Sequence, residues 1–277
     1  MPRPKKPVIS RGGVWSLAWA WPKQNAPPKD GIQLPDIVDH KLERSAEDTE
    51  KLARAHGYPY PAPADDFLFQ GGQACPLPDV LDLADRTPVI AVGSNRAPDQ
   101  LVRKFGLGDD VAIPVTWGWL SDFDSVYAGH ISRYGAIPAT LWPSPGSSVR
   151  LAVTWLDAAQ LERMHETEAV GVNYDFRTLT GQSMRLDRSD TLDTIGAYIT
   201  RRGAFAPAGK VLALEAIQAR DRIFPACSET AALQALHAVL KADGSLDDWV
   251  LSIIDTPQRR QQTLTDMQAL LLLWEQE

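Results

Sequence analysis

The fold of this chain is decided at residues 89–98, which read Val-Ile-Ala-Val-Gly-Ser-Asn-Arg-Ala-Pro. The apolar run predicts a buried strand, and Pro98 with the segment behind it predicts a helix over residues 99–105. Between the two, Gly93 permits a positive φ and a close approach of another group to the backbone. The free N–H groups of such a loop can hold an anion or a polarised carbonyl oxygen. Many strand-to-helix turns of this kind bind nothing, so both interpretations stay open on this stretch alone.

The composition is that of an ordinary globular chain of 277 residues with a formal net charge of -7 at pH 7. An acidic chain is not expected to bind nucleic acid through bulk electrostatics. No apolar run reaches the length that a membrane span needs. Cys75 and Cys227 are too few for a disulfide framework or a zinc cluster, which predicts a reducing, cytoplasmic location and no metal site.

The sequence divides into three segments. Residues 1–87 predict an N-terminal extension, irregular apart from one surface helix from Asp36 to His56. Residues 88–225 predict the main domain, and residues 226–277 predict a C-terminal helical extension. The last helix is expected to end in the Leu-Leu-Leu-Leu-Trp run at residues 270–274, which must be buried against its own domain or in a homodimer contact.

Short segments with strand character follow one another closely in the main domain. They are residues 111–120, 124–132, 136–142, 149–155, 172–178, 184–186 and 194–200. A helix is expected from Asp157, which can form a capping box with Gln160, to about Glu168. Further helices are predicted at residues 214–224, 229–240, 247–254 and from Thr256 onward. This spacing favours an α+β fold with a small mixed or antiparallel β-barrel over a doubly wound sheet.

Three segments of the main domain contain recognisable sequence motifs, and their order along the chain is informative. Residues 89–95 form an apolar strand that ends in Gly-Ser-Asn, and residues 135–156 contain Ser-Pro-Gly followed by Val-x-x-x-Val-x-Trp. Residues 161–170 form a helix ending at a glutamate, with Tyr174 downstream. Together they resemble the gamma-glutamylcyclotransferase family, also called the butirosin-cyclotransferase type, over roughly residues 88–200.

The resemblance implies the family's β-barrel fold and its reaction. In that reaction the α-amine of a γ-glutamyl group attacks its own side-chain carbonyl, closes 5-oxoproline and releases an amine. The resemblance implies a small γ-glutamyl substrate and no cofactor. It also implies a catalytic Glu168 and a substrate site lined by Val92, Gly93, Ser94, Asn95 and Tyr174.

Two positions depart from the family pattern. Val92 stands where the family has Tyr or Phe, which predicts a different substrate or a loss of activity. Ala169 replaces the usual Gly after the catalytic Glu. Two alternatives therefore stay open: a non-catalytic ligand-binding or assembly module, and a γ-glutamyl hydrolase or transferase.

The sequence position of Glu168 favours a role in proton transfer. It lies at the end of a helix, where the macrodipole is negative, and Glu162 and Glu166 are close in sequence. In an apolar site these neighbours are expected to raise its pKa. The backbone amides of Gly93 and Ser94 are expected to hold the developing oxyanion. The alternative is that Glu168 is a solvated surface residue.

Other polar groups match known sites less well. The helix around His165 lacks the second His of a zinc-protease helix, and Ser94 lacks the second Gly of a nucleophile elbow. His130, Arg133 and Tyr134 form a polar cluster between strands. Arg133 could hold a substrate carboxylate with two hydrogen bonds, or lie in a surface turn.

Overall fold

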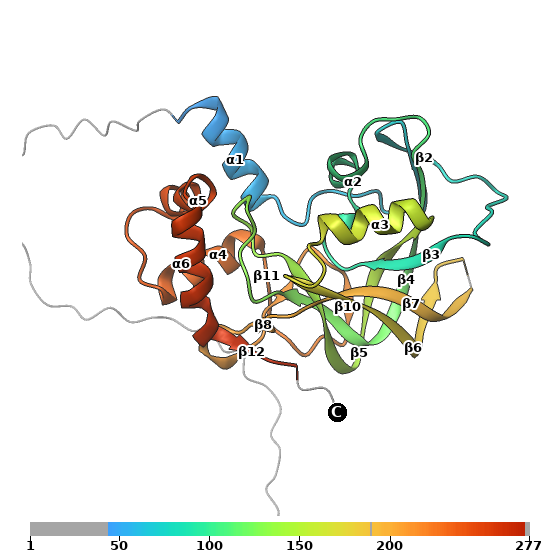
Figure 1. The fold of residues 1–277 in the computed structure, drawn as a ribbon. Coiled ribbons are helices and arrows are strands. Elements are labelled where there is room, and N and C mark those ends of the chain that lie inside the picture. The colour runs from blue at the N-terminus through green and yellow to red at the C-terminus, as the bar shows by residue number, and fades with distance from the viewer. Residues whose placement is uncertain (1–43, 189, 275–277) are drawn as a thin grey trace, which may run out of the picture. The chain divides into compact units, whose positions relative to one another are not determined.

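Two long strands, β4 (Ala112–Tyr127) and β5 (Ala139–Leu156), form the centre of the sheet. The computed structural model describes residues 44–188 and 190–274 (Figure 1). Each long strand unites two segments that the sequence predicts as separate strands. In β4 the reason is a register shift beside Asp122, whose φ of 62° kinks the strand without ending its pairing with β5.

The strand pairings form a closed path. β3 (Thr87–Ala91) pairs antiparallel with β5 and parallel with β7 (Thr191–Thr200). β6 (Tyr174–Leu186) pairs antiparallel with both β7 and β4. The path β5–β3–β7–β6–β4 then returns to β5 through the β4–β5 pairing. The described chain is therefore α+β with a mostly antiparallel sheet, which agrees with the α+β class that the sequence predicts.

Both faces of β5 are buried over residues 151–156, although Val149, Leu151, Val153 and Trp155 alternate with more polar or smaller residues, a pattern that predicts one buried face. Leu151 and Val153 belong to a large apolar core with residues of the C-terminal helices. Ala152 and Leu156 belong to a second core with residues of α2 (Pro98–Phe105) and α3 (Ala158–Thr167). The alternating pattern does not predict the second buried face, because helices rather than water cover that face.

The N-terminal elements pack against this sheet. Of the helix predicted from Asp36 to His56, residues 36–43 lie outside the described residues, and the structure shows α1 at Ala46–His56, capped by Ser45. β1 (Phe67–Gln70) pairs with β2 (Gln73–Pro76) and with β4. These pairings cross the boundary expected between residues 87 and 88, and the chain from Arg44 onward forms one compact unit.

The remaining helices gather at one end, next to α1 (Figure 1). They are α4 (Glu229–Val239), α5 (Leu246–Asp255) and α6 (Pro257–Met267), in good agreement with the predicted helices. Among the described helices none has the length and apolar character to cross a membrane. The short elements are η1 (Ser94–Arg96), η2 (Pro207–Gly209), η3 (Gln268–Leu270), β8 (Ala204–Phe205), β9 (Ala213–Leu214), β10 (Ala219–Arg220), β11 (Ala226–Cys227) and β12 (Leu271–Leu272).

The helix predicted over residues 214–224 is wrong. This stretch instead contains β9, which pairs with β4 and β11, and β10, which pairs with β5. Arg222 donates two hydrogen bonds to the fully buried carboxylate of Asp124, at 2.8 and 2.9 Å, and a third to the Ile217 carbonyl. A long-range ion pair and strand pairing thus override a weak helical pattern.

The apolar tail is also not helical. α6 ends at Met267, and β12 pairs antiparallel with β8. The Trp274 ring packs against the rings of Phe123 and Trp142, while Leu273 is 70% exposed. The chain therefore covers part of this tail itself, and a homodimer through the rest stays a prediction.

Candidate active site

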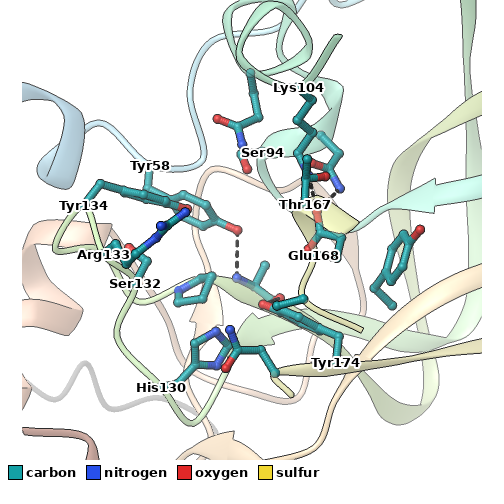
Figure 2. Close-up of a pocket in the computed structure, with 18 of the residues that line it drawn as sticks. Tyr58, Ser94, Lys104, His130, Ser132, Arg133, Tyr134, Thr167, Glu168 and Tyr174 are labelled. Atoms are coloured by element: carbon teal, nitrogen blue, oxygen red, sulfur yellow. Dashed lines mark hydrogen bonds and ion pairs between the residues drawn. The ribbon is translucent and has the colours of Figure 1, made fainter. Parts of the chain in front are cut away.

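A cavity of about 720 Å³ lies between the β3–α2 loop, the end of α3 and the loop between β4 and β5 (Figure 2). It is flanked by α2, through Gln100, Arg103 and Lys104, and by Tyr58 from the segment after α1. All six residues named by the sequence resemblance lie in its wall: Val92, Gly93, Ser94, Asn95, Glu168 and Tyr174. The fold therefore brings together side chains that are up to 82 positions apart in the sequence (174 − 92).

Gly93 is required by the crowding around it. Its φ is −130°, outside the left-handed region. A Cβ at this position would lie 2.0 Å from the Tyr58 hydroxyl oxygen and 2.9 Å from the Ala139 Cβ. The Tyr58 hydroxyl is held there because it accepts a 2.7 Å hydrogen bond from the Ala139 amide. Of the two reasons for a glycine that the sequence offers, the close approach is the one that applies.

The loop after Gly93 leaves amide hydrogens unused. Ser94 begins the short turn η1, and Pro98 begins α2 directly behind it. The backbone amides of Gly93 and Ser94 donate to no acceptor within the described chain. Gly93 and Ser94 both line the cavity, and Ser94 is buried there. An amide without an acceptor inside the protein can donate to an oxygen atom of a ligand.

Glu168 caps the C-terminal end of α3 and faces the same loop. Its side chain is 15% exposed. Oε1 accepts a 2.9 Å hydrogen bond from Asn95 Nδ2 and forms an ion pair with the Lys104 ammonium. Lys104 also donates to the Thr167 hydroxyl at 3.0 Å. Oε2 accepts no hydrogen bond from any described residue, which leaves it free for a ligand.

The expected rise in the pKa of Glu168 is wrong. Burial alone would raise the pKa, but the charge and hydrogen bond of Lys104, the hydrogen bond of Asn95 and a smaller electrostatic effect of His130 together outweigh it. The net effect is a lowered pKa, so Glu168 is a carboxylate at neutral pH. Sequence reasoning missed Lys104, although a lysine three positions after Leu101 on the buried face of a helix is a usable signal.

The residue after Glu168 adopts a conformation that suits glycine. Ala169 has a φ of 51°, which is strained for a residue with a Cβ. Gly171 follows with a φ of 84°. The sharp reversal at the end of α3 explains why the family resemblance places a glycine where this chain has Ala169.

Two buried aromatic side chains form the floor of the cavity. The Tyr174 hydroxyl donates a 3.1 Å hydrogen bond to the Ala139 carbonyl, and its ring meets the His130 ring edge-on at 5.4 Å. His130 is 4% exposed, and its Nδ1 has no partner among the described residues. Burial, with a smaller effect of Arg202, lowers the pKa of His130 to about 3, so the ring is neutral at pH 7. The sequence places His130 in a polar cluster but gives it no role.

The site offers a carboxylate, a loop with two free amides and a neutral imidazole. The described residues contain no group of three or more His, Cys, Asp or Glu side chains arranged to hold a metal ion. The groups present are suited to accept an ammonium at Glu168 and a polarised carbonyl oxygen at the loop.

Comparison with known proteins gives structural similarities only. No family model and no curated protein sequence matches this chain. A solved structure titled gamma-glutamyl cyclotransferase is 16% identical, with a TM-score of 0.35, over 42% of this chain and 66% of that chain. The match thus spans just under two thirds of the cyclotransferase chain.

Two further solved structures are similar to this chain. A solution structure of an Arabidopsis thaliana protein is 18% identical over 43% of this chain and 72% of that chain, with a TM-score of 0.34. A crystal structure of an uncharacterised Homo sapiens protein is 14% identical over 62% of this chain and 99% of that chain, with a TM-score of 0.37. A cyclotransferase structure is therefore among those similar to this chain.

Proposed function

We propose that this chain cyclises a γ-glutamyl amide to 5-oxoproline and releases the amine. The observation that supports the proposal is the position of the Glu168 carboxylate and of the free amides of Gly93 and Ser94 in the wall of one cavity. The closed path of strand pairings supports a description of the sheet as a small β-barrel of the gamma-glutamylcyclotransferase type.

The proposed reaction needs no water and no second substrate. The α-nitrogen of the glutamyl group forms a bond to the γ-carbonyl carbon, and the bond from that carbon to the leaving nitrogen breaks. Glu168 takes a proton from the α-ammonium through Oε2 and passes it to the leaving nitrogen. Once the new bond has formed, the ring nitrogen loses a second proton, and the amine leaves with it as an ammonium. The amides of Gly93 and Ser94 stabilise the oxyanion that develops in between. Because nucleophile and electrophile belong to one molecule, the substrate itself supplies most of the proximity.

The lowered pKa of Glu168 fits the binding of the substrate ammonium, which precedes the proton transfer. A carboxylate held ionised by Lys104 attracts the substrate ammonium. The ion pair uses Oε1, so Oε2 can receive the ammonium without breaking the contact with Lys104. Lys104 is therefore proposed as a positioning residue, which orients the carboxylate and sets its charge.

The size of the side chains in the cavity wall affects which substrates fit. Val92 and Tyr174 are both buried beside the loop and the carboxylate. A valine is smaller than the tyrosine or phenylalanine of the family, so the proposed site has more room beside the loop for the substrate. The reducing, cytoplasmic location predicted from two cysteines is part of the same proposal.

The proposal is tested by assaying purified protein for 5-oxoproline with a panel of γ-glutamyl amides. Wild-type protein is expected to release 5-oxoproline and amine in equal amounts. Glu168→Gln should lower the rate about 10²- to 10⁴-fold, the usual range for loss of an acid–base group. Glu162→Gln, an exposed glutamate on the same helix, is the matched control and should retain activity.

Two results would contradict the proposal. Absence of 5-oxoproline across the panel would favour a ligand-binding or assembly module. Release of free glutamate, or transfer of the γ-glutamyl group to an added amine, would favour a hydrolase or a transferase.

A further inference from the structure

A buried carboxyl group outside the cavity contacts the segment that forms part of its wall. Glu229 is the first residue of α4 and is 2% exposed. Its Oε1 accepts a 2.7 Å hydrogen bond from the Ile137 amide, 92 positions earlier in the sequence. Pro138 and Ala139 follow directly, and both line the cavity. Glu229 therefore connects the C-terminal helices to the Ile137–Ala139 segment of the cavity wall.

The second oxygen of this carboxyl group is buried without a partner. Oε2 of Glu229 is hidden from water and has no hydrogen-bond partner among the described residues. Burial raises the pKa of Glu229 well above its ordinary value, and the hydrogen bond from Ile137 lowers it by less. The described ionisable groups that respond to its charge include no cation; they are Tyr58, Tyr60, Tyr127, Tyr134 and Cys227. A hidden oxygen without a counter-ion favours the neutral acid over the carboxylate.

Three buried side chains from different parts of the chain hold the Ile137–Ala139 segment. Glu229 accepts from its first amide. The Tyr58 hydroxyl accepts from the Ala139 amide at 2.7 Å (Figure 2), and the Tyr174 hydroxyl donates to the Ala139 carbonyl at 3.1 Å. Both tyrosines line the cavity, whereas Glu229 approaches the segment from α4. The position of the segment therefore depends on a residue that does not itself line the cavity.

The same segment packs directly against the loop with the free amides. A Cβ at Gly93 would lie only 2.9 Å from the Ala139 Cβ. In a close-packed interior a displacement of one group is passed on to the groups that touch it. A shift of Ala139 would therefore change the position of Gly93 and of the Ser94 amide that follows it.

We propose that Glu229 is a positioning residue for the amides of Gly93 and Ser94. Its Oε1 fixes the Ile137–Ala139 segment, and the segment fixes the loop. The inference rests on the proposed function, in which these amides hold the oxyanion, and extends it to a residue of α4. Because the oxyanion develops only in the transition state, loss of this contact should lower kcat more than it changes KM.

Two substitutions of Glu229 that differ in one acceptor oxygen test the proposal. Glu229→Gln retains Oε1 and matches the shape of the neutral acid, whereas Glu229→Met has a similar length and only a weakly accepting sulfur. For 5-oxoproline release, Glu229→Gln should keep the wild-type kcat. Glu229→Met should lower kcat about 10- to 100-fold, the cost of a misplaced catalytic group.

Thr154→Val is the matched control for the loss of a buried hydrogen bond. The Thr154 hydroxyl is buried and donates to the Val89 carbonyl at 3.2 Å, and neither residue lines the cavity. This variant should keep the wild-type kcat. A loss of kcat in Glu229→Met but not in Thr154→Val separates positioning of the loop from general destabilisation.

Amide NMR spectra report the contact whether or not the chain is an enzyme. In Glu229→Met the Ile137 amide should exchange faster with solvent, and the amide resonances of Gly93 and Ser94 should shift. In Glu229→Gln all three should stay as in wild type. Unshifted Gly93 and Ser94 resonances in Glu229→Met, or an equal kcat for the two variants, would overturn the positioning role.

The two measurements also separate this inference from the proposed reaction. If wild-type protein releases no 5-oxoproline from any γ-glutamyl amide, the proposed function fails. The resonances of Gly93 and Ser94 then still decide whether Glu229 positions the loop, since they need no turnover. If wild-type protein is active and Glu229→Met keeps its kcat, the proposed function stands and the positioning role is overturned.

Discussion

At the scale of single residues, the contact between Lys104 and Glu168 decides how the proposed site responds to pH. The pKa of Glu168 lies below its ordinary value of 4.5 because the lowering effects of Lys104, Asn95 and His130 exceed the raising effect of burial. The acid limb of the kcat/KM profile for 5-oxoproline release is therefore expected below pH 4.5. A catalytic glutamate with a raised pKa would place that limb closer to neutrality.

Removal of the Lys104 charge tests this account. In Lys104→Met the effect of burial remains and the largest lowering effect is lost, so the acid limb should move to higher pH. The measurement is the pH dependence of kcat/KM for wild type, for Lys104→Met and for the exposed control Lys210→Met. An acid limb that stays in place in Lys104→Met would show that the ion pair does not set the protonation of Glu168.

Buried His130 predicts a second pH effect, on stability. Its pKa is about 3 in the folded protein, against 6.5 for a histidine exposed to water, so the unfolded chain binds more protons between these values. The free energy of unfolding should therefore fall as the pH drops from 6.5 toward 3. Between pH 7 and pH 4.5 the fall due to His130 is expected to be roughly 2–3 kcal/mol.

The comparison of wild type with His130→Gln isolates this contribution. Denaturant unfolding at pH 7 and at pH 4.5 should show a smaller loss of stability on acidification in the variant, because no imidazole then has to be kept neutral. Equal losses in the two proteins would mean that His130 is protonated in the folded state.

The sequence predicts the residues of the candidate site better than their electrostatics. Glu168 and the loop from Val92 to Asn95 can be named from their order along the chain, and the structure places them in one wall. The sign of the pKa shift could not be predicted, because it depends on Lys104, which is 64 positions away in the sequence and meets Glu168 only through the packing of α2 on α3.

At the scale of elements, the turn between β3 and α2 depends on the contact of Gly93 with Tyr58. A Cβ in Gly93→Ala would lie 2.0 Å from the Tyr58 hydroxyl and 3.0 Å from its Cζ. The variant is expected to be less stable by about 1–3 kcal/mol, the usual cost of overpacking, and to lose activity because the loop amides move. Denaturant unfolding and the 5-oxoproline assay measure the two effects.

A double-mutant cycle tests whether the Tyr58 hydroxyl, rather than another neighbour of the loop, causes the loss of stability in Gly93→Ala. Tyr58→Phe removes the hydroxyl and its hydrogen bond from the Ala139 amide, so the single variant should also lose stability. If the hydroxyl is the obstacle, Gly93→Ala should cost less in the Tyr58→Phe background than in wild type. If the effects of the two substitutions on the free energy of unfolding are strictly additive, the Tyr58 hydroxyl is not the cause of the destabilisation.

The elements show where sequence patterns succeed and where they do not. The capping box of Asp157 and Gln160 correctly marks the start of α3, because it depends on neighbouring residues alone. The segment at residues 214–224 is strand and loop because distant partners, β4, β5, β11 and Asp124, decide its conformation. Periodicity over so short a segment does not report those partners.

At the scale of the whole molecule, the ion pair of Arg222 and Asp124 ties the segment before α4 to the central strand β4. The Asp124 carboxylate is fully buried and Arg222 is its ionic partner. Arg222→Met would leave that charge without its counter-ion, which is expected to destabilise the protein by about 3–5 kcal/mol. Arg220→Met, whose guanidinium lies on the Trp119 ring, should cost about 1 kcal/mol or less.

Thermal or denaturant unfolding of Arg222→Met, of Arg220→Met and of the double variant Asp124→Asn/Arg222→Met measures the contribution of this ion pair to stability. The double variant should recover much of the lost stability, because no unpaired buried charge remains at this contact. Equal stabilities for Arg222→Met and Arg220→Met would show that the segment is held by its strand pairings alone.

The proposed reaction requires one carboxylate and one loop to hold the two reacting ends of a γ-glutamyl group. A crystal structure of Glu168→Gln with γ-glutamyl-alanine tests it most directly, because the inactive variant should retain the uncyclised substrate. We expect the γ-carbonyl oxygen within hydrogen-bond distance of the Gly93 and Ser94 amides, and the α-nitrogen beside the side chain of residue 168. A substrate bound in the cavity with its γ-carbonyl turned away from the loop would contradict the claim.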